Sequence, residues 1–154
     1  MAADWFVRSA SPADLESILA LEQACAEAPH WSPAAWLAAI NPEHKTAPIR
    51  AAFVVEQNGG IWGFAVGTCA GDLAELESVA VSVHTRRQGV GKALCLRVMD
   101  WSRETGARTI ELEVRASSKG ALALYGSLGF VEQGRRRQYY QSPPEDAVLL
   151  AAQL

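Results

Sequence analysis

A strand-like segment that runs through two glycines into a helix constrains this chain more than any other feature. Residues 79–94 read Val-Ala-Val-Ser-Val-His-Thr-Arg-Arg-Gln-Gly-Val-Gly-Lys-Ala-Leu. The N-terminus of a helix offers backbone N–H groups that have no acceptor within the helix, and glycine lets a phosphate approach the backbone closely. The segment therefore predicts an anion-binding turn, to which Arg86, Arg87 and Lys92 add positive charge.

Three kinds of phosphate-binding turn compete for this segment, and residue spacing separates them. A P-loop needs glycine at Arg86 and Ser or Thr at Ala93. A dinucleotide-binding turn needs a third small residue at Leu94 and belongs to a much longer domain. The hexapeptide from Arg86 to Gly91 instead fits the pattern Arg/Gln-x-x-Gly-x-Gly/Ala. Two glycines are also what an ordinary strand-to-helix turn contains, so this pattern alone leaves both interpretations open.

The rest of the chain alternates between predicted strands and predicted helices. The predicted strands are Trp5–Arg8, Ala52–Gln57, Ile61–Thr68, Leu73–Val83 and Thr109–Val114, followed by short strands at the C-terminus. The predicted helices run from Ser11 to about Glu27, briefly from Ser32, from Val90 to Thr105 and from Lys119 to Leu128. Hairpins come first and strand–helix–strand comes later, so we expect an α/β (α+β) protein with a mixed sheet and one parallel pair.

The composition is that of a globular protein, with 49% hydrophobic and 20% charged residues in a chain of 154. This length fits one domain over residues 1–154. Three scattered cysteines, and no histidines at ligand spacing, predict no disulfide and no metal site. Neither a leader-like N-terminus nor an apolar run of about 20 residues occurs, so we expect a cytoplasmic protein without membrane contact. A formal charge of −3 argues against nucleic-acid binding and suits a basic peptide partner.

Further motifs resemble those of one enzyme family. Arg86–Gly91 resembles the pyrophosphate-binding motif of GNAT acetyltransferases. Three later segments follow it in the same order and at similar spacings as in the bacterial ribosomal-protein-alanine N-acetyltransferase (RimI) family. These segments are Leu112–Ser117 (Leu-Glu-Val-Arg-Ala-Ser), Ala123–Phe130 (Ala-Leu-Tyr-Gly-Ser-Leu-Gly-Phe) and Arg136–Tyr140 (Arg-Arg-Gln-Tyr-Tyr). The resemblance covers nearly the whole chain and is strongest from Glu75 to Tyr140.

The resemblance implies a fold and an activity. The implied fold is the GNAT fold, a mixed and mostly antiparallel central sheet with helices on both faces. The implied activity is transfer of an acetyl group from acetyl-CoA to a protein N-terminal α-amine, with alanine of a small-subunit ribosomal protein as the leading acceptor. We expect a monomer or a weak dimer. Two alternatives stay open: the same chemistry on a lysine side chain or a small-molecule amine, and a non-catalytic acyl-CoA-binding module.

By the same resemblance, Glu113 is the general base and Tyr125 the general acid. Glu75 is a reserve candidate for the base, because some other GNAT enzymes place theirs on the strand before the glycine turn. Ser118 stands where the family commonly has asparagine, so we expect an altered cofactor contact there. The expected cofactor-binding residues are Val79, Ala80, Val81, Arg86, Arg87, Gln88, Gly89, Val90, Gly91, Lys92 and Ser118.

Without the family resemblance, the residue patterns predict an ordinary structural role for each of these side chains. Along Thr109–Val114 apolar and acidic residues alternate, which predicts a half-buried strand with Glu113 facing solvent. Tyr125 lies on an Ala/Leu-rich predicted helix, and this setting predicts that its ring packs in the hydrophobic core or at the rim of the core. The charge run Arg135–Arg137 predicts a solvated loop. The presence of both Glu113 and Tyr125 favours an enzyme over a binding module, which has no need of an acid–base pair.

Overall fold

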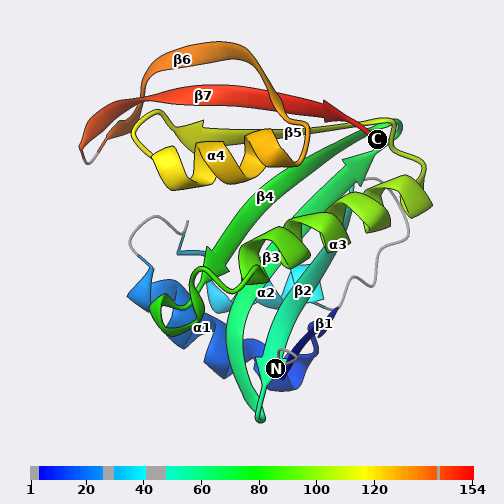
Figure 1. Cartoon of the computed structure of the whole chain (residues 1–154). Coiled ribbons are helices and arrows are strands. Elements are labelled where there is room, and N and C mark those ends of the chain that lie inside the picture. Colours follow the sequence, from blue (N-terminus) through cyan, green and yellow to red (C-terminus); the bar gives the residue numbers. More distant parts are fainter. Residues whose placement is uncertain (1–3, 26–29, 41–47, 142) are drawn as a thin grey trace.

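A mixed sheet of seven strands forms the centre of the computed structural model, which describes residues 4–25, 30–40, 48–141 and 143–154 (Figure 1). The strands are β1 (Trp5–Ser9), β2 (Ile49–Gln57), β3 (Gly60–Ala70), β4 (Leu73–Val81), β5 (Thr109–Arg115), β6 (Val131–Gln141) and β7 (Pro144–Gln153). Their order across the sheet is β1-β2-β3-β4-β5-β7-β6. The β4–β5 pair is parallel and the other neighbouring pairs are antiparallel, which confirms the expected mixed sheet.

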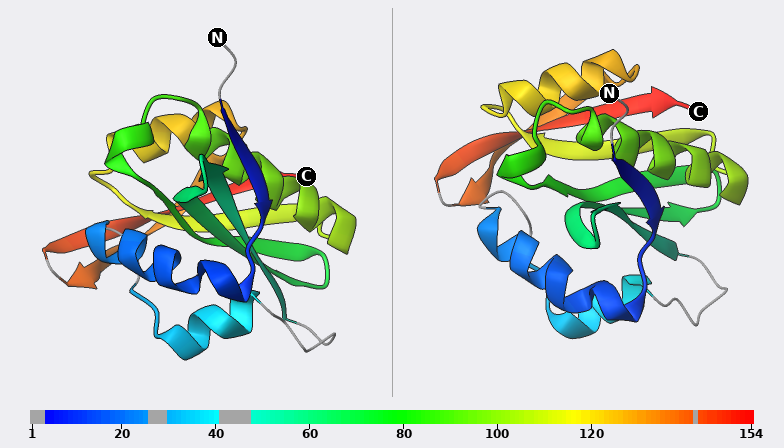
Figure 2. Two further views of the ribbon diagram at one scale, coloured as in Figure 1. Left: turned by 90° about the horizontal axis from the view of Figure 1, so that it is seen from below. Right: turned by 60° about the horizontal axis from the view of Figure 1, so that its bottom comes forward.

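Helices cover both faces of the sheet, as expected (Figure 2). The helices α1 (Leu15–Ala24) and α2 (Pro33–Ile40) lie on one face, while α3 (Val90–Thr105) and α4 (Lys119–Ser127) lie on the other. Each face has its own buried cluster. On the α1–α2 face, Trp36 packs edge-on against Phe64 with ring centroids 4.8 Å apart. The predicted end of the first helix at Glu27 falls outside the described residues, and α1 ends at Ala24 within them.

Helix α3 begins and ends where the sequence predicts. Gly89 precedes it at φ 80° and Gly106 follows it at φ 105°, both in the left-handed region that favours glycine. Val90, Leu94 and Val98 recur every four residues along its buried side. This stripe packs α3 against β3 and β4, so the glycine turn is fixed beside the C-terminal end of β4.

The last two strands differ from the prediction of short strands, since β6 has 11 residues and β7 has 10. Strand β7 pairs with both β5 and β6, and it buries Ala147, Val148 and Leu150 in the core. Arg135–Arg137 therefore lies within β6, where a solvated loop was predicted. The three arginines are exposed, because β6 is an edge strand and charged side chains are well suited to such an edge.

Strands β4 and β5 pair over only a short distance and then separate. Their register runs from Leu73–Thr109 to Glu75–Glu111 and stops there, although both strands continue. In β4 the pairing with β3 shifts between Leu76 and Ser78, which leaves Glu77 as an extra residue, a β-bulge. A bulge bends a strand and increases its twist. Figure 1 shows β4 diverging from β5, so the sheet is open between them.

We expect Gly67 to be required for the close approach of α3 to β3. A Cβ atom on Gly67 would lie 2.7 Å from Cγ1 of Val98 and 3.0 Å from Cζ3 of Trp101. Gly67→Ala should therefore lower the free energy of unfolding by about 1–3 kcal/mol, as overpacking does in other cores. Gly126 on α4 has open space around its Cβ position, so Gly126→Ala should be neutral or stabilise by up to about 1 kcal/mol. Urea denaturation of both variants checks this, and equal stabilities would contradict it.

Candidate active site

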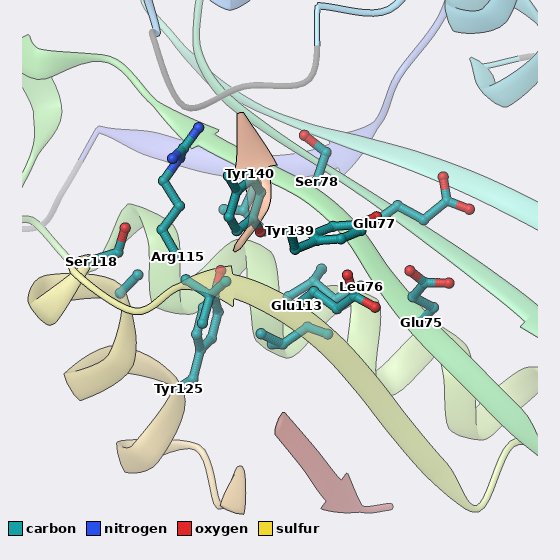
Figure 3. Close-up of a pocket in the computed structure, with 14 residues that line it drawn as sticks. Glu75, Leu76, Glu77, Ser78, Glu113, Arg115, Ser118, Tyr125, Tyr139 and Tyr140 are labelled. Carbon is teal, nitrogen blue, oxygen red and sulfur yellow. The ribbon is translucent and has the colours of Figure 1, made fainter. Parts of the chain in front are cut away.

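The opening between β4 and β5 holds a cavity of about 490 Å³ (Figure 3). Four segments that are distant in the sequence form its walls. They contribute Glu75, Leu76, Glu77, Ser78 and Val79 from β4, Leu112, Glu113, Val114 and Arg115 from β5, Ser118 just before α4, Ala121 and Tyr125 from α4, and Tyr139 and Tyr140 from β6. The cavity thus brings together Glu113, Tyr125, Glu75, Ser118 and Val79, all of which the sequence singled out.

Glu113 lines this cavity instead of facing bulk solvent, so the interpretation from pattern alone was wrong. Its side chain is 24% exposed, and its Oε1 lies 3.3 Å from Nη2 of Arg136 on β6. The physical reason is the strand separation. Where β4 departs from β5, the outward side of β5 faces a gap that α4 and β6 partly cover, so an outward carboxylate becomes part of a cavity wall.

Tyr125 lies at the rim of the same cavity. Its ring packs edge-on against Phe130 with centroids 5.7 Å apart, and it is half-buried on α4. Figure 3 shows Tyr125 on α4 and Glu113 on β5, and both line the same cavity. The pattern-based expectation of a core or rim aromatic is therefore correct, and the rim is that of the cavity. A carboxylate and a phenol on neighbouring walls are the groups that acid–base catalysis requires.

Glu75 lies on the β4 side of the cavity, close to further carboxylates. Burial is the largest cause that raises the pKa of its carboxyl group, followed by the negative charges of Glu77 and Glu113. Glu77 itself is held in place by Arg50, at 3.1 Å, and by the hydroxyl of Thr68, which donates to its Oε1. No sequence pattern pointed to Glu77, because its position follows from the bulge in β4.

Two tyrosines from β6 complete the cavity, and an irregular strand places them there. Between the pairs Arg136–Ala147 and Tyr140–Glu145, three residues of β6 lie opposite Asp146 alone. Gln138 takes a φ of 48°, and its N–H donates to Oδ1 of Asp146 at 3.0 Å. Burial raises the pKa of the Tyr140 phenol. The family resemblance drew attention to Tyr139 and Tyr140, but no sequence pattern predicted the bulge.

The predicted glycine-containing turn forms at the start of α3, and anion binding by it stays a prediction. Its first helical hydrogen bond runs from the N–H of Ala93 to the carbonyl of Gly89 at 3.0 Å, so the preceding amides have no acceptor within the helix. The side chains of Arg86, Arg87, Gln88 and Lys92 are exposed around this turn, whereas Val90 is buried. None of these residues lines the cavity. They are separated from β4 by residues 82–85, which include the short 3-10 helix Val83–Thr85. Of the β4 residues singled out from the sequence for cofactor binding, Val79 lines the cavity while Ala80 and Val81 do not.

Ser118 occupies the position before the first residue of α4. Its side chain makes no capping hydrogen bond to that helix, contrary to the capping role that a serine there suggests. It lines the cavity instead.

A second cavity of about 430 Å³ adjoins the first on the α2 side of β4. Its walls are Trp31, Ala35, Ala38, Arg50, Glu75 and Glu77. The fully buried carboxylate of Glu22 on α1 accepts hydrogen bonds from the backbone N–H of Trp31, at 3.0 Å, and from the indole of Trp36, at 3.1 Å. These bonds hold Trp31 at the edge of the cavity.

The part of the chain that the structure describes contains neither a metal-binding group of side chains nor a membrane-spanning helix. Within it, no group of three or more His, Cys, Asp or Glu side chains is arranged to hold a metal ion. Among the helices of the same residues, none has the length and apolar character to cross a membrane.

Comparison with known proteins identifies the family. Residues 15–130 match the acetyltransferase (GNAT) family, and the chain belongs to it. The protein is accordingly an N-acetyltransferase, the activity for which its relatives are named. Enzymes of this family use acetyl-CoA as the acetyl donor.

The relatives place the chain more narrowly within that family. It is 43% identical over 101 residues to the ribosomal protein bS18-alanine N-acetyltransferase of Escherichia coli (strain K12), an alignment that covers 64% of this chain and 68% of that enzyme. The crystal structure of the ribosomal-protein-S18-alanine N-acetyltransferase from Escherichia coli matches with a TM-score of 0.80 and 33% identity, covering 97% of this chain and 93% of that one. Ard1 from Thermoplasma volcanium matches with a TM-score of 0.82 and 27% identity over 99% of both chains.

Proposed function

We propose that this protein acetylates the N-terminal α-amine of a protein, with an N-terminal alanine of a small-subunit ribosomal protein as the first acceptor to test. The observation that carries the proposal is the meeting of Glu113 and Tyr125 on the walls of one cavity, at the point where the sheet opens. The similarity to an enzyme named for bS18 alanine supports this acceptor. A single domain over residues 1–154, a cytoplasmic location and a monomer or weak dimer stay predictions.

The donor would bind along β4 and the glycine turn. The amides from Gln88 to Lys92 suit the pyrophosphate of acetyl-CoA, and Arg86 and Arg87 supply positive charge beside them. The backbone of Val79–Val81 suits the pantetheine and acetyl end, because β5 does not pair with β4 there. Ser118 lies on the cavity wall as a further contact.

In the proposed reaction the amine attacks the thioester carbonyl directly, so no enzyme nucleophile is needed. The Glu113 carboxylate takes a proton from the incoming ammonium group, which frees the nitrogen lone pair for attack on the carbonyl carbon. Attack forms the carbon–nitrogen bond and a tetrahedral intermediate. As this intermediate collapses, the carbon–sulfur bond breaks and the Tyr125 hydroxyl gives its proton to the leaving thiolate. The nitrogen loses its second proton, which restores the Tyr125 hydroxyl and leaves a neutral amide, and the proton on Glu113 passes to solvent. Backbone N–H groups of β4 in the gap are suited to stabilise the oxyanion between these steps.

Glu75 is the second candidate for the base, on a specific observation. Burial and neighbouring carboxylates raise the pKa of Glu75, and a higher pKa makes a carboxylate a stronger acceptor of the ammonium proton. Glu113, by contrast, has Arg136 as an ion-pair partner. Both carboxylates line the same cavity, so kinetics must distinguish them.

We expect the enzyme to prefer a peptide with a free N-terminal Ala or Ser over an internal lysine. An α-amine has a pKa near 8 and is partly neutral at physiological pH, whereas a lysine side chain, with a pKa near 10.4, is almost wholly protonated. Acetyl transfer from acetyl-CoA should be measured on peptides that differ only in their first residue. An N-terminally blocked lysine peptide and a free small amine serve as controls. Acetylation mainly of lysine would show that the acceptor is a lysine side chain and not an N-terminal α-amine.

We expect Gly91→Val to weaken acetyl-CoA binding by well over tenfold. A Cβ on Gly91 would lie at ordinary contact distances, 3.5 Å from Cδ2 of Leu124 and 3.6 Å from Cγ2 of Val81, so the fold should tolerate the change. The branched side chain would crowd the amides proposed to hold the pyrophosphate. Gly126→Val, on α4 and in open space, is the matched control. Calorimetric titration with acetyl-CoA checks this, and unchanged affinity in folded Gly91→Val would place the pyrophosphate elsewhere.

We expect Glu113→Gln to lower kcat by about 100-fold or more, because the base is removed while its shape is kept. Acetyl-CoA affinity should stay constant, and the loss should shrink as the pH rises past the pKa of the amine. Tyr125→Phe should lower kcat less for an acyl donor whose thiol is more acidic and leaves unaided. Glu75→Gln is the matched comparison and should be mild. The opposite ranking of the two glutamates would assign the base to β4.

A further inference from the structure

The second cavity is continuous in its walls with the proposed catalytic cavity, because Glu75 and Glu77 belong to both. Its remaining lining differs in character. Trp31, Ala35 and Ala38 are apolar, while Arg50 adds one positive charge, which is paired with Glu77 at 3.1 Å. The lining thus keeps one more carboxylate than it has cations, and together with the apolar residues it suits a side chain with an aliphatic stem and a cationic end.

The carboxylates around these cavities are unequally paired. Glu77 is paired with Arg50 and Glu113 with Arg136, at 3.1 Å and 3.3 Å. Among the ion pairs of the described residues, none involves Glu75. Glu75 lies in the field of Glu77, Glu113 and Glu111, and the opposing effect of Arg50 on its pKa is smaller than that of any of these carboxylates, so a further cation beside Glu75 would relieve repulsion.

A buried hydroxyl lies on the wall of the first cavity, next in sequence to a residue that both cavities share. Ser78 follows the shared residue Glu77 on β4 and lines the first cavity. The residue is only 7% exposed, and its Oγ has no hydrogen-bond partner among the residues described. An unsatisfied buried hydroxyl costs stability, so it indicates a group that arrives with a ligand. The backbone of a peptide passing from one cavity to the other offers N–H and C=O groups for it.

We propose that the second cavity binds an arginine or lysine side chain of the acceptor, within the first few residues after the acetylated one. The stem of that side chain packs against Trp31 and the α2 alanines, its cationic end faces Glu75, and Ser78 hydrogen-bonds the intervening backbone. This specificity rests on the proposed function and refines it. The preferred acceptors are then N-terminal peptides with an early basic residue.

The test compares peptides that share a first residue and differ at one later position. An Arg, Gln or Glu residue is placed in turn at positions 2, 3 and 4, and at position 8 as a distant control. We expect kcat/KM for the Arg peptide to exceed that for the Gln peptide about fivefold at one early position, with Glu lower still and no difference at position 8. The advantage should fall as salt is added.

Variants then locate the effect in the cavity. Glu75→Gln should reduce the Arg-to-Gln ratio to near one, whereas Glu16→Gln, exposed on α1 and outside both cavities, should leave it unchanged. Ala38→Lys should lower the ratio by charge repulsion, whereas Ala34→Lys, exposed on the same helix but not lining the cavity, should not. Each ratio compares two peptides on one variant. A loss of base function at Glu75 would lower kcat/KM for both peptides by the same factor, so it would leave the ratio unchanged. Ser78→Ala should raise KM for the peptide and not for acetyl-CoA.

The outcomes separate this inference from the proposed function. A wild-type enzyme that acetylates none of the N-terminal peptides overturns the proposed function. Acetylation of Arg, Gln and Glu peptides at equal rates, or an Arg preference that survives both Glu75→Gln and Ala38→Lys, overturns the second cavity as the basic subsite.

Discussion

The separation of β4 from β5 is the constraint on which the site depends. Two parallel strands that stay paired would bury their facing backbone groups in mutual hydrogen bonds and leave no space between them. Here the pairing stops at Glu75 and Glu111, after three residue pairs. The gap receives side chains from both strands, and α4 and β6 close over it from elsewhere in the chain. The backbone of β4 that faces the gap leads through residues 82–85 into the glycine turn before α3.

Elements with strong local signals could be predicted from the sequence. Helix α3 matches its predicted bounds because glycines in left-handed conformations mark both ends and an apolar stripe fills the space between. The hairpin of β2 and β3 follows from Asn58-Gly59, both at positive φ. Strands β6 and β7 were less predictable. Their length comes from pairing with each other and with β5, and the irregularity in β6 depends on the Asp146 side chain, eight residues from Gln138.

The site residues also divide into those that could be predicted from the sequence and those that could not. The alternating pattern of β5 predicted that Glu113 points away from the core, but it could not predict that the side chain lines a cavity. The cavity exists because β4 separates from β5, and that separation is not encoded in the residues of β5. The family resemblance supplied what the pattern lacked, and the structure gathers Glu113, Tyr125, Ser118, Val79 and Glu75 around one cavity. Glu77 and the second cavity were missed, since a bulge and the packing of α2 on the sheet leave no trace in residue spacing.

The ion pair between Glu113 and Arg136 gives the resting enzyme a cation at the place where the proposed mechanism puts the substrate's ammonium group. Substrate binding then becomes an exchange of one positive charge for another. Such an exchange yields little net electrostatic free energy, because the new contact replaces an existing one. The guanidinium of Arg136 also lies over the ring of Tyr139, 5.4 Å from its centroid, and its side chain is 56% exposed, so it has a contact outside the ion pair. Amines would therefore be distinguished less by their charge at this carboxylate than by how the rest of the acceptor fits between α2 and β6.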